Sequence, residues 1–248
     1  MGYFMKMIKW AFLLLIAGFI TNTCSTQTGA QSNFFEMGPT MLGVVTNNKV
    51  QFYEYYDNEW TYAPDSDFTL PNGYRGVFGI EYSALGVIVN NKVQLYAYLY
   101  EWTHNSYYDF MLPNGYESVF RIGFNGLGVI VNNKVRFYEI GDDEYGDAGW
   151  IYDPDSDFTL PNGYEGVFGI GHDDDVLGVI VNNKVQFYEY GDDEWTYDSD
   201  SDFTLPNGYE GVLGIGLNIL GVIIHNKVQF YEYADDEWTL DADADFIK

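Results

Sequence analysis

Residues 177–190 read LGVIVNNKVQFYEY, and this stretch decides the fold because closely similar versions of it occur five times along the chain. The copies begin at Leu42, Leu85, Leu127, Leu177 and Leu220, and successive starts lie 43, 42, 50 and 43 residues apart. A period of this length is typical of a closed array of similar modules. Whatever the protein does, we expect it to do so at several places.

Each repeat predicts four short strands joined by turns. In the fourth copy these strands are residues 166–171, 177–181, 184–190 and 194–205. Asn182 and Asn183 separate the second strand from the third, and asparagine tolerates the positive φ that a two-residue hairpin turn requires. Pro206-Asn207-Gly208 then ends the fourth strand and turns the chain into the next repeat.

Four strands in about 43 residues is the size of a propeller blade. The second strand is apolar at every position, so both faces of each sheet must be covered, as they are between two neighbouring blades. The sequence therefore predicts an all-β, five-bladed β-propeller with four antiparallel strands per blade. The expected blades are about 34–73, 74–115, 116–163, 164–208 and 209–248. The sequence leaves open whether the first segment instead completes the last blade and locks the ring.

The N-terminus has the layout of a secretory signal. Lys6 and Lys9 precede an apolar run from Trp10 to Ile20, and a small, polar stretch ends at Ala30. A run of about 11 residues is too short for a spanning helix, which needs roughly 20. We therefore expect a signal peptide over 1–30, a single propeller domain over 31–248, a secreted or extracytoplasmic location and no stable membrane insertion. Lipid anchoring at Cys24, the single cysteine, is the alternative.

Composition narrows the class of partner. The formal net charge is −26, and such a surface repels nucleic acid and anionic membranes. Cations, neutral sugars and basic proteins are the partners that it permits. Aromatic residues make up 19% of the chain, which argues for a packed core and against disorder.

The repeat number, the repeat length and the exported context resemble those of five-bladed propeller lectins of the tachylectin-2 kind. The EWT sequence that opens most of the fourth strands is also similar to the tryptophan position of kelch repeats. The lectin resemblance implies a secreted, multivalent protein that binds glycans or glycoproteins.

Two sets of loop residues are candidates for a ligand site. If the strands run up and down within each blade, the Asn-Asn-Lys hairpins and the Leu-Pro-Asn-Gly-Tyr linkers lie on the same face of the ring. Amides and aromatic rings together suit a shallow sugar pocket. The candidates are Asn48, Asn91, Asn133, Asn183 and Asn226 in the hairpins, and Asn72, Asn114, Asn162, Asn207, Tyr74, Tyr116, Tyr164 and Tyr209 in the linkers. The alternative is that tight turns alone require these residues.

The repeated aromatic residues have two interpretations. One tryptophan and one tyrosine recur in all five copies: Trp60, Trp102, Trp150, Trp195 and Trp238, and Tyr53, Tyr96, Tyr138, Tyr188 and Tyr231. Such rings can stack on sugars, but packing between blades is the interpretation that we favour.

Acids alternate along the fourth strand, as in Asp198, Asp200 and Asp202. Period two predicts that they share one side of a strand. They either bind calcium or protect an outer sheet edge from aggregation, and we favour edge protection. The last acid of the series is present in every copy, as Asp67, Asp109, Asp157, Asp202 and Asp245, and is predicted to brace the following turn.

Two functional hypotheses follow from these features. The first is a lectin-like binding module with equivalent sites, and the alternative is an acidic extracellular interaction or matrix protein that binds calcium or basic proteins. The three histidines occupy unrelated repeat positions, so no catalytic arrangement is predicted. We expect no enzyme activity and no cofactor.

Overall fold

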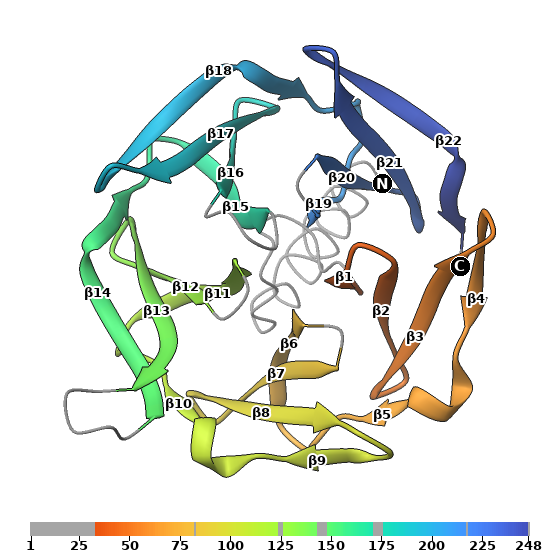
Figure 1. The fold of residues 1–248 in the computed structure, drawn as a ribbon, viewed down its shortest axis with the longest axis vertical. Helices are drawn as coiled ribbons and strands as arrows, with labels where there is room; N and C mark the ends of the chain where they lie inside the picture. The colour runs from red at the N-terminus through yellow and green to blue at the C-terminus, as the bar shows by residue number, and fades with distance from the viewer. Residues whose placement is uncertain are drawn as a thin grey trace, which may run out of the picture.

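The protein is a five-bladed β-propeller, shown in Figure 1 as a ring of five sheets around a central axis. The computed structural model describes residues 33–81, 83–123, 126–142, 148–170, 176–216 and 218–247. The predicted signal peptide over 1–30 and Cys24 lie outside this part of the chain. Within the described residues, no helix is both long enough and apolar enough to cross a membrane.

The four strands of each blade are consecutive in sequence and antiparallel, from the central axis outward. The innermost strands are β1 (Phe34–Gly38), β6 (Tyr74–Glu81), β11 (Tyr116–Ile122), β15 (Tyr164–Ile170) and β19 (Gly211–Ile215). The second strands are β2 (Met41–Thr46), β7 (Ala84–Val89), β12 (Gly126–Val131), β16 (Val176–Val181) and β20 (Ile219–Ile224). The third strands are β3 (Lys49–Tyr56), β8 (Lys92–Tyr98), β13 (Lys134–Asp142), β17 (Lys184–Gly191) and β21 (Lys227–Ala234).

The fourth strand of each blade lies at the outer edge of the ring, as the sequence predicted (Figure 1). In three blades it is continuous: β14 (Ala148–Thr159), β18 (Glu194–Thr204) and β22 (Glu237–Ile247). In the first two blades a short 3₁₀ turn divides it. The pieces are β4 (Glu59–Tyr62), η1 (Pro64–Ser66) and β5 (Phe68–Thr69) in blade 1, and β9 (Trp102–His104), η2 (Ser106–Tyr108) and β10 (Phe110–Met111) in blade 2.

The hairpin turns have the backbone conformation that the sequence predicted. Asn182 and Asn183 have φ values of 50° and 63°, and the equivalent residues of the other copies are also positive. Two consecutive positive φ values match the right-handed twist of the flanking strands, which is why asparagine recurs here. The turn between the third and fourth strands of blade 4 repeats this geometry with Asp192 and Asp193, at 51° and 65°.

The hydrophobic core is divided into five clusters, one at each seam between neighbouring blades. At the seam between blades 4 and 5, Phe168, Val185 and Phe187 pack against Val212 and Leu220. Both faces of every sheet are therefore covered, as expected from the apolar second strands. At the last seam, Phe34 and Leu42 of blade 1 pack against Phe230 of blade 5. Over the described residues the ring thus closes by blade packing, and each of the five sheets is built from strands that are consecutive in sequence.

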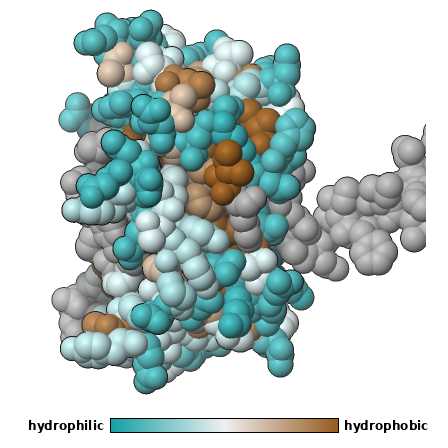
Figure 2. All heavy atoms as spheres, turned by 90° about the vertical axis from the view of Figure 1, so that its right-hand side faces the viewer, coloured by the Kyte–Doolittle hydropathy of each residue, from teal (hydrophilic) through white to brown (hydrophobic). Residues whose placement is uncertain are grey.

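One side of the outer surface is seen to be mainly hydrophilic (Figure 2). Figure 2 shows the side of the ring that carries β4 and β22, where polar side chains predominate and apolar ones are confined to small separate areas. This distribution agrees with the strongly acidic composition.

Candidate functional site

The predicted hairpin asparagines hold the blades to their linkers. The side-chain Nδ2 of Asn48 donates to the carbonyl of Leu70 at 3.1 Å, and that of Asn183 donates to Leu205 at 2.8 Å. Asn91 and Asn133 make the same bond to Leu112 and Leu160. The backbone N–H of each of these leucines donates in turn to the carbonyl of its asparagine. These four amides therefore have a structural use, and Asn226 occupies the equivalent turn position of the fifth copy, with a φ of 64°.

The predicted linker residues lie on the same turns. Asn72, Asn114, Asn162 and Asn207 are exposed, and each precedes a glycine with a φ between 76° and 80°. The four linker tyrosines, Tyr74, Tyr116, Tyr164 and Tyr209, are half-buried. The structure places these thirteen candidates as turn and linker residues, and their role in ligand binding stays a prediction.

Two of the linker tyrosines also connect neighbouring blades. The hydroxyl of Tyr164 donates to Glu117 at 3.0 Å, and that of Tyr209 donates to Glu165 at 3.0 Å. Burial and the adjacent carboxylate raise the pKa of Tyr164 and of Tyr209 to about 12. These phenols are therefore protonated donors that hold one linker to the next.

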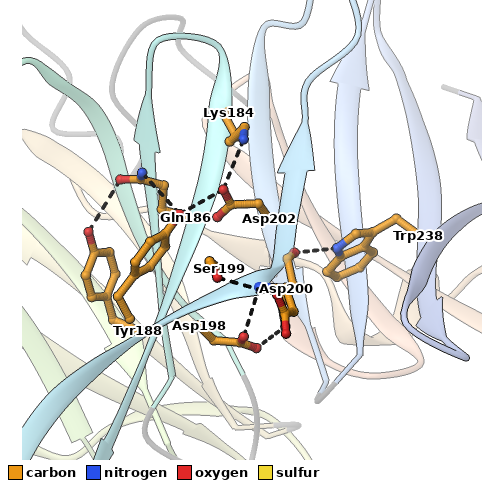
Figure 3. A network of polar contacts seen from close by, with 10 residues as sticks. Lys184, Gln186, Tyr188, Asp198, Ser199, Asp200, Asp202 and Trp238 are labelled. Atoms are coloured by element: carbon orange, nitrogen blue, oxygen red, sulfur yellow. Dashed lines mark hydrogen bonds and ion pairs between the residues drawn. The ribbon is translucent and has the colours of Figure 1, made fainter.

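The last acid of the outer strand forms a polar network with the third strand. Asp202 accepts from Lys184 at 3.0 Å and from the hydroxyl of Tyr197 at 2.8 Å (Figure 3). In blade 2, Lys92 and His104 hold Asp109 in the same way, at 2.7 and 2.8 Å. Burial by itself would raise the pKa of Asp109, but the hydrogen bonds from Lys92 and His104 outweigh it, so the pKa lies below its usual value.

The predicted period-two ladder of acids is broken by a bulge. Phe187 pairs with Asp198, whereas Val185, two residues earlier, pairs with Phe203, so residues 199–202 form an insertion in β18. Asp198 fixes the bulge because its carboxylate accepts from the backbone N–H of Asp200 at 3.1 Å and from the hydroxyl of Ser201. The acids of one ladder therefore have separate roles.

The bulge provides the acceptor for the tryptophan of the next blade. The indole N–H of Trp238 donates to the carbonyl of Ser201 at 2.7 Å (Figure 3), and its ring stacks on Phe187 at 5.5 Å. Equivalent bonds join Trp60 to Ala244, Trp102 to Ser66, Trp150 to Tyr108 and Trp195 to Ser156, at 2.6 to 2.7 Å. The packing role that we favoured for the tryptophans is confirmed at all five seams.

A cavity of about 380 Å³ lies beside this tryptophan, between blades 4 and 5. We call it the blade 4–5 cleft. Its volume falls within the range typical of small-molecule sites, about 300 to 1,000 Å³. Its lining residues are Ile170, Val176, Phe187, Glu189, Asp198, Asp200, Ser201, Asn218, Tyr233, Asp236 and Trp238. The cleft opens on the face of the ring opposite the Asn-Asn hairpins, and it combines aromatic rings with carboxylates from two blades.

A smaller version of this cleft, of about 90 Å³, lies between blades 5 and 1. Its lining includes Tyr55 and Trp60 from blade 1 with Phe230, Glu232 and Asp241 from blade 5, which are equivalent to Tyr233, Trp238, Phe187, Glu189 and Asp198. Burial raises the pKa of Tyr55, and the carboxylates of Asp241 and Asp243 across the seam raise it further. The same residue types are thus brought together at two seams.

Sequence reasoning did not identify these clefts. A glutamate three residues before the turn between the third and fourth strands recurs as Glu54, Glu139, Glu189 and Glu232, and this recurrence is the signal that could have pointed to the clefts. The sequence does not show that Glu189 and Trp238 of the next blade line the same cleft, because the two residues come together only across a seam.

An ion pair between two blades lies in the central channel. Five innermost strands line a narrow cavity of about 50 Å³, and at equivalent positions three of them have glycine: Gly79, Gly169 and Gly214. The other two have Glu36 and Arg121, whose Oε1 and Nη1 atoms lie 3.5 Å apart. The Arg121 side chain is 8% exposed, and that of Glu36 is 17% exposed. Blades 1 and 3 are therefore joined across the axis by an ion pair whose arginine is buried and whose glutamate is half-buried.

No protein-family model matches the chain. No curated protein matches it significantly.

Several solved structures resemble the chain at low sequence identity. A functionally unknown protein from Desulfotomaculum acetoxidans is 12% identical, with 86% of this chain and 68% of that chain covered and a TM-score of 0.41. Hsv2 from Kluyvelomyces marxianus is 11% identical, with coverage of 88% and 82% and a TM-score of 0.40. A protein of unknown function from Bacteroides caccae is 9% identical, with coverage of 82% and 72% and a TM-score of 0.44. Similarity at this level transfers no function to the present chain.

Proposed function

We propose that the protein is a secreted, multivalent carbohydrate-binding propeller whose sugar sites are the clefts between blades. The observation that supports this most is the blade 4–5 cleft, where Trp238 and Tyr233 lie beside the carboxylates of Glu189 and Asp198. Aromatic rings contact the apolar C–H faces of sugars, and carboxylates accept hydrogen bonds from hydroxyl groups. The cleft is therefore chemically suited to a sugar ring.

The recurrence of the cleft supports multivalency. The blade 5–1 cleft repeats its aromatic and acidic residues on the same rigid ring. Two or more weak sites on one body can increase the combined affinity by about 10²–10⁴ without a new contact. A surface glycan with repeated sugars is the kind of ligand that such an arrangement favours.

A glycan-array screen of the purified protein, run with calcium and again with chelator, tests the proposal. We expect binding to a narrow set of glycans in both conditions. The location is tested with Asn218→Trp, which fills the blade 4–5 cleft from an exposed loop position, beside Asn207→Trp as the matched change in an exposed linker. Loss of binding in Asn218→Trp alone would support the cleft. Loss in Asn207→Trp alone would move the site to the predicted linker residues, and no binding by the unmodified protein would contradict the proposal.

The net charge of −26 favours one alternative, an acidic interaction protein that binds calcium or basic proteins. Within the described residues, no group of three or more His, Cys, Asp or Glu side chains is arranged to hold a metal ion. Calcium binding in this alternative would therefore be weak and dispersed over the surface. A rise in melting temperature of many degrees at millimolar calcium would favour a specific calcium site over our proposal.

A further inference from the structure

The blade 4–5 cleft is acidic on both of its walls. Glu189, Asp198 and Asp200 come from blade 4, and Asp236 comes from the facing turn of blade 5. Glu189 and Asp236 are exposed, whereas Asp198 is half-buried at the base of the bulge. Among the residues that the structure describes, those that line the cleft include no lysine or arginine. A ligand that enters it therefore experiences a field of one sign from two directions.

This charge is not arranged for a metal ion. Asp198 already accepts hydrogen bonds from Asp200 and Ser201, which fix its carboxylate in the bulge. Among the described residues, the acids of the cleft do not form a group of three that could chelate a metal. The four carboxylates are instead distributed around a cavity whose other walls are the rings of Phe187, Tyr233 and Trp238. Dispersed carboxylates with aromatic walls suit an organic cation, because rings and carboxylates both attract an ammonium group.

From this arrangement we propose that the blade 4–5 cleft selects glycans whose sugars carry a free, protonated amino group, over N-acetylated and anionic glycans. The inference rests on the proposed carbohydrate-binding function and adds the class of sugar. An N-acetyl group is neutral, so it has no charge for the four carboxylates to attract. Uronic and sialic acids are repelled by the same carboxylates.

The other seams provide internal comparisons. The blade 5–1 cleft keeps Glu232 and Asp241, so it is a smaller site of the same class. At the seam between blades 2 and 3, Ala97 and Asn105 replace the glutamate and the aspartate, and Ile140 replaces the tyrosine. That seam also has Tyr107 at the place of Asp200, so three of the four acids of the blade 4–5 cleft are missing from its sequence.

The test compares two oligosaccharides of equal length by isothermal titration calorimetry with the full chain. One is a β-1,4-linked glucosamine oligomer, and the other is its fully N-acetylated counterpart. We expect the amino oligomer to bind at least about tenfold more tightly at low ionic strength, and this advantage to decline as salt screens the carboxylates. A lysine oligopeptide of the same charge serves as a third probe.

Two variants test whether selectivity for the amino oligomer depends on the carboxylates of the blade 4–5 cleft. Glu189→Gln and Asp236→Asn remove one charge each from exposed positions, and copy one already has Asn58 at the place of Asp236. Exposed ion pairs contribute about 0.2–1 kcal/mol, so we expect each variant to lose up to about fivefold in affinity for the amino oligomer. Binding of the N-acetylated oligomer should change little. Glu101→Gln, an equal loss of charge at an exposed site in blade 2, is the matched control and should leave both affinities unchanged.

The outcomes separate this inference from the function on which it rests. Equal binding of both oligomers, or equal effects of Glu189→Gln and Glu101→Gln, would overturn the amino-sugar selectivity and leave carbohydrate binding in place. Tighter binding of the lysine peptide, weakened by Glu189→Gln, would overturn it in favour of a basic protein ligand. If neither oligomer binds and the glycan array is also blank, the carbohydrate function itself fails.

Discussion

At the scale of single residues, the repeated tryptophan does more than fill space. Each indole N–H donates to a backbone carbonyl in the bulge or 3₁₀ turn of the preceding blade, so five equivalent hydrogen bonds run around the ring. These bonds are half-buried, which makes a donor without its acceptor costly. The tryptophan therefore stabilises the seam between two blades, and in Trp238 the exposed part of the side chain also lines the blade 4–5 cleft.

Replacement of Trp195 by phenylalanine tests the hydrogen bond separately from the packing. Trp195→Phe keeps a ring against Phe137 but leaves the Ser156 carbonyl without its donor, so we expect a loss of about 1–2 kcal/mol in the free energy of unfolding. Urea denaturation measures this loss. Tyr197→Phe, which removes an exposed hydroxyl bond to Asp202, is the comparison and should cost about 0.5 kcal/mol or less. Similar losses in both variants would contradict the seam role.

The linker tyrosines make stability depend on alkaline pH. The pKa of Tyr164 and of Tyr209 is about 12 in the folded protein, above the ordinary value of 10.0 for tyrosine. Because the folded value is the higher one, their contribution to stability is complete below pH 10 and is lost as the pH rises through 12. Thermal melts between pH 9 and about 12 should show this decline. The double variant Tyr164→Phe/Tyr209→Phe should show a shallower decline, and an unchanged slope would count against these bonds.

At the scale of strands and turns, the Asn-Asn hairpin combines two requirements in one residue. The second asparagine has a positive φ, 63° at Asn183, and its side chain also holds the carbonyl of the linker leucine at 2.8 Å. Alanine satisfies neither requirement, and glycine satisfies only the first. The hairpin and the linker are thereby connected into one end of the blade.

Two substitutions at this turn should separate the requirements. Asn183→Gly removes the bond to Leu205 but tolerates the backbone conformation, so we expect a loss of about 1 kcal/mol. Asn183→Ala adds backbone strain to that loss, and we expect about 1 kcal/mol more. The two melting temperatures measure the difference. Equal stability of the two variants would show that the positive φ carries no cost here.

At the scale of the whole molecule, five-fold repetition is broken at the central axis. Where Gly169 stands, a Cβ atom would collide with the backbone carbonyl of Arg121, because the innermost strands approach so closely. Glu36 and Arg121 replace glycine in two blades and meet across the channel. A buried pair of opposite charges specifies which blades face each other, since one charge alone is costly in the interior.

Removal of one partner should therefore destabilise the ring more than removal of both. We expect Arg121→Met to lower the free energy of unfolding by about 1–3 kcal/mol, because it removes the guanidinium that lies 3.5 Å from the half-buried Glu36 carboxylate. The double variant Glu36→Met/Arg121→Met should recover most of that loss. Chemical denaturation of Glu36→Met, Arg121→Met and the double variant completes a double-mutant cycle. If the two single losses simply add in the double variant, the pair does not act as a unit.

The sequence by itself determined the five blades, their four strands and their turns, because these depend on local properties: the continuous apolar second strand of each repeat, positive φ at Asn182 and Asn183, and the break at Pro206. It also indicated that Trp238 and its equivalents pack between blades. It could not place Glu189 and Asp198 beside Tyr233 and Trp238, nor Glu36 beside Arg121. Those neighbours come from different blades, and only closure of the ring sets the seam geometry, the bulge and the width of the channel. The clefts and the axial ion pair were thus decided by the tertiary structure, because their residues lie far apart in sequence and no local preference encodes their contact.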